Sequence, residues 1–382
     1  MYSISGYGEM IADQVRVAAF ARALRKVVTP NSVVVDIGSG TGIFALLACK
    51  CGARRVHAIE PADVIEAARQ VAAANGYADR IVFHQALSTR VALPERADVI
   101  VSDLRGVLPF FEHHIPSIVD ARLRFLATGG KLIPHRDFLR ATVVTAEDTY
   151  AIYNRPWGDN GYDLNLTPAL RMVLNDWRKA RITADQFLTE PECLATLDYT
   201  TIENPDLRAE ADFTVTAGGT AHGLCVWFET ELADGVCFTN EPGAPEHLYG
   251  QAFFPLLEPL HVEKGDEVAI KLRADLTGDD YIWCWETRLY SGSGRSYSKA
   301  ELKQSTFFAV PLSPKQLQKR SADYVPVLSE DGEVEKFALT LMNGNSKLKD
   351  IALQLGEHFP HRFKNPNDSL TFAGEVSLKY GR

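Results

Sequence analysis

The sequence predicts an α/β protein in which a Rossmann-like domain is followed by a β-barrel domain with a helical insertion and by a small winged-helix-like domain. The chain has 382 residues, more than one ordinary hydrophobic core can bury, so two or three domains are expected. Helix and strand patterns alternate from residue 9 to about 138, whereas short alternating strands separated by Gly, Pro and Asp turns fill residues 139 to about 312. Short amphipathic helices follow. These changes of pattern place the domains at 1–138, 139–314 and 315–382.

The first domain is expected to hold a mainly parallel sheet with helices on both faces. Residues Glu9–Val27 carry apolar side chains at helical spacing, and Ala62–Asn75 also reads as a helix. Strands are expected around these helices, at 33–37, 55–60, 81–85, 98–102 and about 131–134. Because strand and helix alternate, the strands of such a domain run mainly parallel.

A glycine-rich turn follows the first of these strands and predicts the cofactor. The strand contains Asp36, and the turn contains Gly38, Gly40 and Gly42. Glycine lets the backbone approach a ligand with no Cβ in the way. The acid would repel a pyrophosphate but suits a cationic ammonium or sulfonium, and Glu60 after the second strand can accept both ribose hydroxyls. We therefore predict S-adenosylmethionine (SAM); the alternative is a tight turn with no ligand.

Composition excludes several classes of function. The net charge of −9 argues against sequence-independent binding to nucleic acid and permits attraction of a cationic substrate. The sequence contains no run of about 20 apolar residues and its first residues lack a signal-peptide pattern, so a cytoplasmic protein is expected. The six cysteines are expected to be reduced, and no spaced His/Cys cluster predicts a metal.

The second and third domains are predicted from strand and helix patterns. Barrel strands are expected at Phe138–Thr145, Asp212–Thr216, Gly223–Glu231, Ala252–Leu257 and Glu267–Leu272. An aromatic-rich insertion, Pro156–Ala180, interrupts them and is either a satellite core or a docking arm. After a linker at Pro311–Pro314, the third domain combines a strand-like segment, Tyr324–Leu328, with three helices, at Glu333–Met342, Lys347–Phe359 and about Ser369–Tyr380.

Three motifs in the first two domains occur in an order that identifies a family resemblance. They are Tyr7–Arg16, the loop Ser102–Glu112 and the segment Glu246–Tyr249. By motif order and domain pattern, residues 4 to about 312 resemble the protein arginine methyltransferases. The resemblance implies that Arg16 pairs with the carboxylate of SAM, a role suited to a bidentate guanidinium. It also implies that Met10, Leu87 and Ser88 contact the cofactor and that Tyr7 lies near the substrate.

The loop after the fourth strand carries the chemistry that this resemblance implies. The family has two glutamates at this separation, and here Asp103 and Glu112 take their places. A guanidinium stays charged in proteins and its nitrogens are weak nucleophiles, so two carboxylates can orient one nitrogen toward the methyl group and one can accept its proton. Alternatively, Asp103 caps the following helix. Arg105 could neutralise Asp103 or bind a substrate carboxylate.

The resemblance implies further roles for Glu246–Tyr249, which stands where the family has a Thr-His-Trp loop facing the acids. His247 keeps the family's histidine and could pair with Asp103 or Glu112, holding that acid ionised. Glu246 would add an acid near the acceptor. Leu248 replaces the tryptophan, a departure that leaves the acceptor class open.

Two further expectations concern partners. The insertion at about 156–180 matches the family's dimerisation arm, which implies a homodimer of twofold symmetry; a local helical hairpin is the alternative. Residues 324–382 resemble PqqD-like peptide-chaperone domains, which bind leader peptides by adding a strand to a sheet edge. An inert appendage is the alternative reading of this segment.

These observations lead to one hypothesis and two rivals. The first is a SAM-dependent N-methyltransferase acting on a guanidino group of a peptide or small molecule. The second keeps SAM but transfers the methyl group to a hydroxyl, carboxylate or other amine. The third is a peptide-binding scaffold without catalysis.

Overall fold

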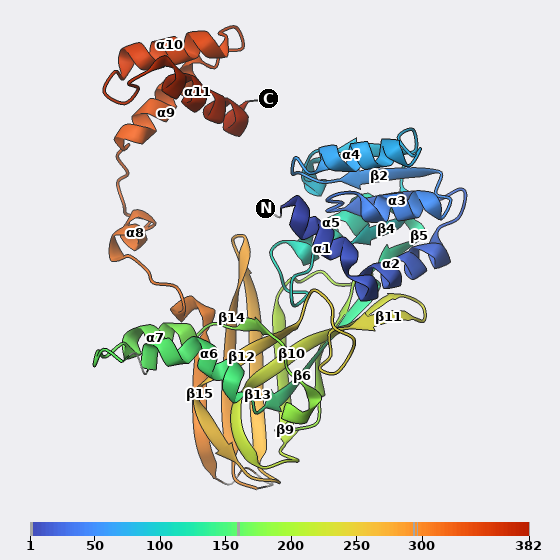
Figure 1. Cartoon of the computed structure of the whole chain (residues 1–382), viewed down its shortest axis with the longest axis vertical. Helices are drawn as coiled ribbons and strands as arrows, with labels where there is room; N and C mark the ends of the chain where they lie inside the picture. The colour runs from blue at the N-terminus through green and yellow to red at the C-terminus, as the bar shows by residue number, and fades with distance from the viewer. Residues whose placement is uncertain (1–2, 159–160, 293–294, 296, 382) are drawn as a thin grey trace. The chain divides into compact units, whose positions relative to one another are not determined.

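The computed structural model describes residues 3–158, 161–292, 295 and 297–381 (Figure 1). The chain divides into two compact units, Met1–Pro311 and Leu312–Arg382. The second unit therefore begins inside the expected linker. The predicted Rossmann-like and barrel domains are both present, but they belong to the same compact unit.

A five-stranded parallel sheet forms the first part of this unit. Its strand order is β3-β2-β1-β4-β5, with every neighbouring pair parallel. The strands are β1 (Val33–Ile37), β2 (Arg55–Ile59), β3 (Ile81–His84), β4 (Ala97–Ser102) and β5 (Leu126–Ile133). The helices that accompany them are α1 (Ile4–Ala12), α2 (Gln14–Val27), α3 (Ile43–Lys50), α4 (Ile65–Ala74) and α5 (His114–Arg124).

The parallel-sheet prediction is confirmed, and the strand order shows where a ligand can enter. All five residues of β1 are buried, as expected for a run of β-branched residues in the middle of such a sheet. The order reverses between β1 and β4. The carboxyl ends of these two strands form the crevice where open α/β sheets bind ligands.

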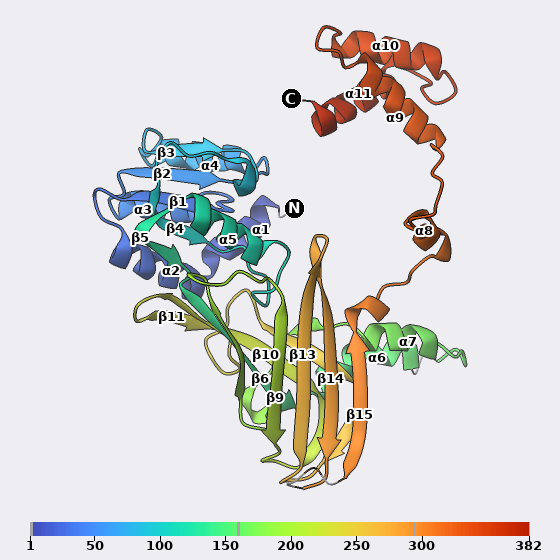
Figure 2. The ribbon, with the colours of Figure 1, turned by 180° about the vertical axis from the view of Figure 1, so that it is seen from behind.

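Two antiparallel sheets form the second part of the unit (Figure 2). One joins β7 (Arg178–Ala180), β12 (Gln251–Val262), β10 (Gly219–Ala233), β6 (Arg136–Val144) and β8 (Glu192–Asp198), with β11 (Val236–Thr239) beside β10. The other has the order β15 (Ser298–Ser305), β14 (Asp280–Tyr290), β13 (Glu267–Thr277) and β9 (Leu207–Thr214). Trp283 and Trp285 of one sheet pack with Phe254 of the other in a common core.

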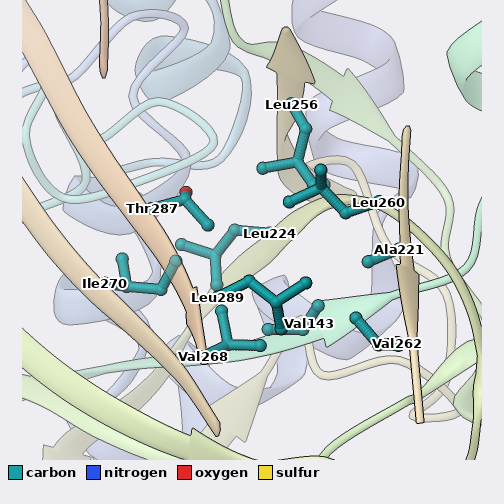
Figure 3. A pocket seen from close by; sticks show the side chains of 11 residues that line it. Val143, Ala221, Leu224, Leu256, Leu260, Val262, Val268, Ile270, Thr287 and Leu289 are labelled. Carbon is teal, nitrogen blue, oxygen red and sulfur yellow. The ribbon is translucent and has the colours of Figure 1, made fainter. Parts of the chain in front are cut away.

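A small apolar cavity of about 10 Å³ lies within this core (Figure 3). Its side chains come from both sheets and include Leu224, Leu256 and Ile270, and Thr287 contributes its one side-chain oxygen. A water needs two or more polar partners, so a cavity of this size and lining stays dry. The cavity therefore offers no place for a polar ligand.

The parallel sheet and the barrel share a second core. Phe20 of α2 stacks on Phe44 of α3, with ring centroids 4.4 Å apart, and also meets Phe238 of β11 at 6.2 Å. Phe228 of β10 and Tyr249 complete the same cluster. This shared aromatic cluster explains why the two predicted domains form one compact unit.

The insertion forms a helical arm, but its bounds differ from those expected. Its helices are α6 (Glu147–Gly158) and α7 (Thr167–Leu174), so the arm begins before residue 156. Arg178–Ala180 belongs instead to β7, paired with β12 in the barrel sheet. Residues 159–160 of the insertion lie outside the described part of the chain. Several large apolar side chains of the arm are exposed: Ile152, Tyr153, Trp157, Tyr162, Leu164 and Met172.

The second unit contains helices α8 (Pro314–Lys319), α9 (Glu330–Leu341), α10 (Leu348–His358) and α11 (Pro366–Tyr380). The last three pack around Val334, Ile351, Leu355 and Val376. The strand predicted at 324–328 is wrong, because these residues are irregular and exposed and have no partner strand within 312–381. The described part of this unit therefore lacks both the wing of a winged helix and the sheet edge that strand addition requires. No described helix of the chain is long and apolar enough to span a membrane.

Candidate active site

The glycine turn between β1 and α3 forms a cradle at the carboxyl edge of the parallel sheet. Gly38, Gly40 and Gly42 all have positive φ, at 71°, 52° and 83°. A Cβ at Gly38 would collide with Leu104, and one at Gly40 would collide with Tyr7. The cradle thus lies directly between the loop after β4 and the first helix. Tyr7, expected near the substrate, packs here against the cradle itself.

Glu60 holds this cradle in shape. Its Oε2 accepts a 3.0 Å hydrogen bond from the backbone N–H of Gly40, and its Oε1 accepts one of 2.9 Å from Ala62. The carboxylate is buried at the end of β2. Its position beside the turn agrees with the predicted place for a ribose-binding acid.

Asp36 is a buried carboxyl with one oxygen left unsatisfied. Its Oδ2 accepts a 2.9 Å hydrogen bond from Ala45 N–H, whereas its Oδ1 has no hydrogen-bond partner among the described residues. Burial raises the pKa of Asp36 to about 7, and the charge of Glu60 adds to this effect. An unsatisfied buried acceptor is costly unless a ligand completes it. A cationic or N–H-bearing group fits this oxygen, as the ammonium of SAM would.

Arg16 connects the first helices to the loop after β4. The Asp13 carboxylate caps α2 by accepting from Arg16 N–H at 3.0 Å. The Arg16 side chain places Nε 2.5 Å from Oδ2 of Asp103 and donates from Nη1 to the Met10 carbonyl at 3.0 Å. Burial alone would lower the pKa of Arg16, but the neighbouring Asp103 charge raises it above its ordinary value. The predicted contact of Arg16 with a cofactor carboxylate remains a prediction.

Asp103 lies at the centre of the site and is almost completely enclosed. Its Oδ2 accepts from Arg16 and from the Tyr249 hydroxyl at 2.8 Å, and its Oδ1 lies 3.2 Å from Nε of Arg105. Burial would raise the pKa of Asp103, but the charges of Arg16 and Arg105 lower it, so the carboxylate is ionised. The alternative that Asp103 caps the following helix is wrong, because His113 occupies the N-cap of α5.

Arg105 faces inward, toward a buried polar network. Its Nη1 donates to Oδ1 of Asp137 at 2.8 Å and to the Thr230 hydroxyl. Tyr199 donates to Oδ2 of the same carboxylate at 2.5 Å, and His114 lies 3.0 Å from the Tyr199 hydroxyl. The expected contact of Arg105 with a substrate is not supported, because its side chain is fully buried. The other expectation, a charge beside Asp103, agrees with the geometry.

Glu112 has a different environment from Asp103. It is exposed, has a positive φ of 43°, and makes no hydrogen bond or ion pair with the described residues. The adjacent His113 lies 3.1 Å from Asp279, at the tip of the β13–β14 hairpin. The two predicted acids are therefore not equivalent: one is enclosed by cations and the other is open to an incoming group.

His247 does not pair with either acid, which corrects the expectation. Its Nε2 donates to the Thr239 carbonyl at 2.9 Å, and its Nδ1 accepts from Tyr249 N–H at 3.3 Å. Burial lowers its pKa. Glu246, predicted near the acceptor, is exposed and forms a 2.9 Å ion pair with Arg181 instead. His247 thus supports the backbone that carries Tyr249.

Sequence reasoning assigned no role to Tyr249, Asp137 or Tyr199. Tyr249 is the last residue of the predicted segment Glu246–Tyr249, so its place two residues after His247 was a usable signal. Asp137 and Tyr199 offered no such local signal, because they meet Arg105 only in the folded barrel. Of the residues expected to contact the cofactor, Leu87 is exposed and Ser88 is buried at the start of the short helix η1 (Ser88–Arg90). The described residues contain no cluster that could hold a metal ion.

Two family models match this chain. One, described as the arginine methyltransferase oligomerization subdomain, matches residues 140–281, and one described as ribosomal protein L11 methyltransferase (PrmA) matches residues 19–133. The chain is 31% identical over 278 residues to protein arginine N-methyltransferase 2 of Mus musculus, an alignment that covers 68% of this chain and 62% of the relative. The chain is thus similar to the protein arginine methyltransferases over 68% of its length.

Other relatives and structures show the same similarity. Protein arginine N-methyltransferase 1 of Dictyostelium discoideum is 25% identical over 266 residues, which cover 68% of this chain and 78% of the relative. A chain of the Trypanosoma brucei PRMT1 enzyme–prozyme complex with AdoHcy matches with a TM-score of 0.71 at 22% identity, over 78% of this chain and 97% of that one. The latter likeness supports the arginine methyltransferase fold. The chain spans 62% and 46% of the two protein arginine N-methyltransferase 2 relatives, from Mus musculus and Dictyostelium discoideum.

Proposed function

We propose that this chain is a SAM-dependent N-methyltransferase that transfers a methyl group to a guanidino nitrogen of a peptide or small molecule. One observation carries the proposal: the loop with Asp103 and Glu112 leaves β4 beside the glycine cradle, where Leu104 packs against Gly38. Carboxylates that suit a cationic acceptor therefore arise at the same sheet edge as the residues that suit the cofactor.

The residues of the cradle fit SAM. Asp36 offers a buried oxygen with no hydrogen-bond partner among the described residues, and Glu60 is held at the end of β2 where a ribose would lie. The glycines leave room for close approach. When bound, SAM supplies an electrophilic methyl group on a sulfonium. The related Trypanosoma complex carries AdoHcy, the demethylated form of this cofactor.

The acids act on the acceptor by position and charge. Glu112 is the carboxylate that is open to solvent, so it holds the incoming guanidinium and can accept the proton that the methylated nitrogen loses. Asp103 fixes Arg16 and Tyr249 around the reaction centre. Such transfer depends on orientation and electrostatics more than on a strong base.

Partners and location complete the proposal. The family model that matches residues 140–281 describes an oligomerization subdomain, and the arm α6–α7 exposes six large apolar side chains. We propose that this arm docks on a second copy to form a homodimer. A cytoplasmic location agrees with six free cysteines. Leader-peptide binding by residues 315–382 remains a prediction, and it would have to use helices.

The direct test is incubation of the full chain with SAM and arginine-containing peptides or small guanidines, followed by mass spectrometry. A mass gain of one methyl group on the guanidino nitrogen, located by fragmentation, is the expected result. Parallel incubations with phenols, carboxylic acids and simple amines control for other acceptors. Methyl transfer to one of these and to no guanidine, with SAM binding shown by calorimetry, would contradict the proposal.

A further inference from the structure

The carboxylate of Asp103 is already surrounded by the protein's own cations. Its side chain is 2% exposed, with Arg16 on one oxygen and Arg105 at 3.2 Å from the other. Resting on the proposed function, we propose that Arg105 is a specificity-determining residue. Its guanidinium neutralises Asp103 from within, so an acceptor guanidinium is held by Glu112 alone.

Charge balance supports this assignment. Arg16 and Arg105 supply two guanidinium groups, and Asp103 and Asp137 supply two carboxyl groups, all of them buried. Burial raises the pKa of Asp137, and the charge of Arg105 opposes this rise. Arg105 therefore occupies the side of Asp103 that Arg16 leaves open, and each carboxylate oxygen of Asp103 already has a neighbouring cation. Glu112 lies outside this set, and its negative charge remains uncompensated among the described residues.

Geometry keeps Arg105 in this place. The Nη1 atom is fixed by Asp137 and Thr230, and the guanidinium lies 5.0 Å from the centre of the Phe228 ring. A planar cation that is bound to a carboxylate and stacked on an aromatic face loses the favourable energy of both interactions if it moves away. An incoming guanidinium therefore cannot displace Arg105 at small cost.

The contact of Arg105 with Asp103 also shows which Asp103 atom would lose its neighbouring cation if Arg105 were substituted. The 3.2 Å approach of Nε to Oδ1 is an ion pair without hydrogen-bond alignment, and Oδ1 accepts no hydrogen bond from the described residues. Removing Arg105 would leave this oxygen without a cation beside it, while Arg16 would stay on Oδ2 of the same carboxylate. A second grip on the acceptor guanidinium would then become available.

The test compares three variants of the full chain in steady-state methylation of one guanidino acceptor. Arg105→Met combined with Asp137→Asn removes the cation beside Asp103 and leaves the net charge unchanged. It should lower the acceptor KM by about tenfold, as expected for a regained close charge pair. Asp137→Asn alone leaves the positive charge of Arg105 without the Asp137 carboxylate. This additional positive charge should repel the cationic acceptor and raise its KM. The affinity for SAM, measured by calorimetry, should change less than about twofold, because neither residue touches the cradle.

A third variant guards against misfolding. Arg105→Lys keeps a buried cation for Asp137 but loses the Nε that faces Asp103, so it should lower the acceptor KM by a smaller factor. If the double variant and Arg105→Lys both leave the acceptor KM of wild type unchanged, the role of Arg105 is overturned while the proposed function stands. If no form of the protein methylates any guanidine although SAM binds, the proposed function itself fails.

Discussion

The hydroxyl of Tyr249 donates a 2.8 Å hydrogen bond to Oδ2 of Asp103 and so joins the barrel to the end of β4. Tyr249→Phe keeps the ring in its core and removes this bond. Because one buried hydrogen bond to a charged group contributes about 1.5–3 kcal/mol, we expect kcat to fall roughly tenfold or more. The affinity for SAM should stay within about twofold. Tyr150→Phe, which loses a hydrogen bond from α6 to the Leu257 carbonyl of the barrel, is the matched control and should retain activity.

Glu112→Gln removes the carboxylate that is open to the acceptor without changing its size. We expect kcat/KM for a guanidino acceptor to fall about 100-fold, because the amide neither balances the cation nor accepts its proton. SAM binding, measured by calorimetry, should be unaffected. Glu357→Gln on α10 changes an equally exposed acid and serves as the control. Full activity of Glu112→Gln would show that another group holds the acceptor.

Asp36→Asn tests the unsatisfied oxygen in the cradle. Burial raises the pKa of Asp36 to about 7, so the folded protein binds a proton there more tightly than the unfolded chain does. The contribution of protonated Asp36 to the free energy of unfolding is therefore complete below about pH 4 and is lost as the pH rises toward 7. The variant should therefore unfold at a higher urea concentration than wild type at pH 8 when no cofactor is present. Its affinity for SAM should fall about tenfold or more, because a charge-assisted hydrogen bond is lost.

Two buried histidines, His57 and His114, and the half-buried His84 affect the pH dependence of stability in the opposite direction to Asp36. Burial lowers the pKa of His57 to about 4 and of His114 to about 3, and it also lowers the pKa of His84. Protons then bind preferentially to the unfolded chain, so this stability is complete above about pH 6.5 and is lost as the pH falls toward 4. Urea unfolding should show a lower free energy at pH 5 than at pH 7.5. His57→Phe should reduce that difference, and an unchanged difference would assign the effect to other groups.

Arg105→Met without a second change should destabilise the protein. It leaves the Asp137 carboxylate buried without its cation, a loss of about 3–5 kcal/mol for a broken buried pair. Adding Asp137→Asn should recover most of the lost stability, because asparagine can still accept a hydrogen bond from Tyr199 and form one with Thr230. Urea denaturation of the two forms checks the difference. Equal midpoints would show that the Asp137 carboxylate is protonated or solvated in the variant.

Local patterns explain how much of the structure could be predicted. The strand Val33–Ile37, the glycine turn and Glu60 lie close together in the chain, and hydrophobic runs and turn residues specify them directly. The parallel sheet and barrel followed from their patterns for the same reason. The strand predicted at 324–328 was wrong for a different reason. Its apolar residues favour a strand, but a strand is stable only when it pairs with a partner strand.

The partners of Asp103 and Arg105 could not be predicted. Tyr249 is 146 residues from Asp103, and Asp137 is 32 residues from Arg105. Their meeting depends on how the barrel packs on the parallel sheet, which no local periodicity encodes. For the same reason, the partner that the motif order suggested for His247 was wrong, because this side chain bonds to the Thr239 carbonyl and to Tyr249 N–H.

The aromatic cluster that joins Phe20 and Phe44 to Phe238 has a consequence for engineering. Exchanging the barrel for that of a relative would change the apolar surface against which α2 packs. Expressing residues 1–138 alone would expose the α2 side of this contact to water. Acceptor preference in this chain is therefore better altered by single substitutions in either domain than by exchanging a whole domain.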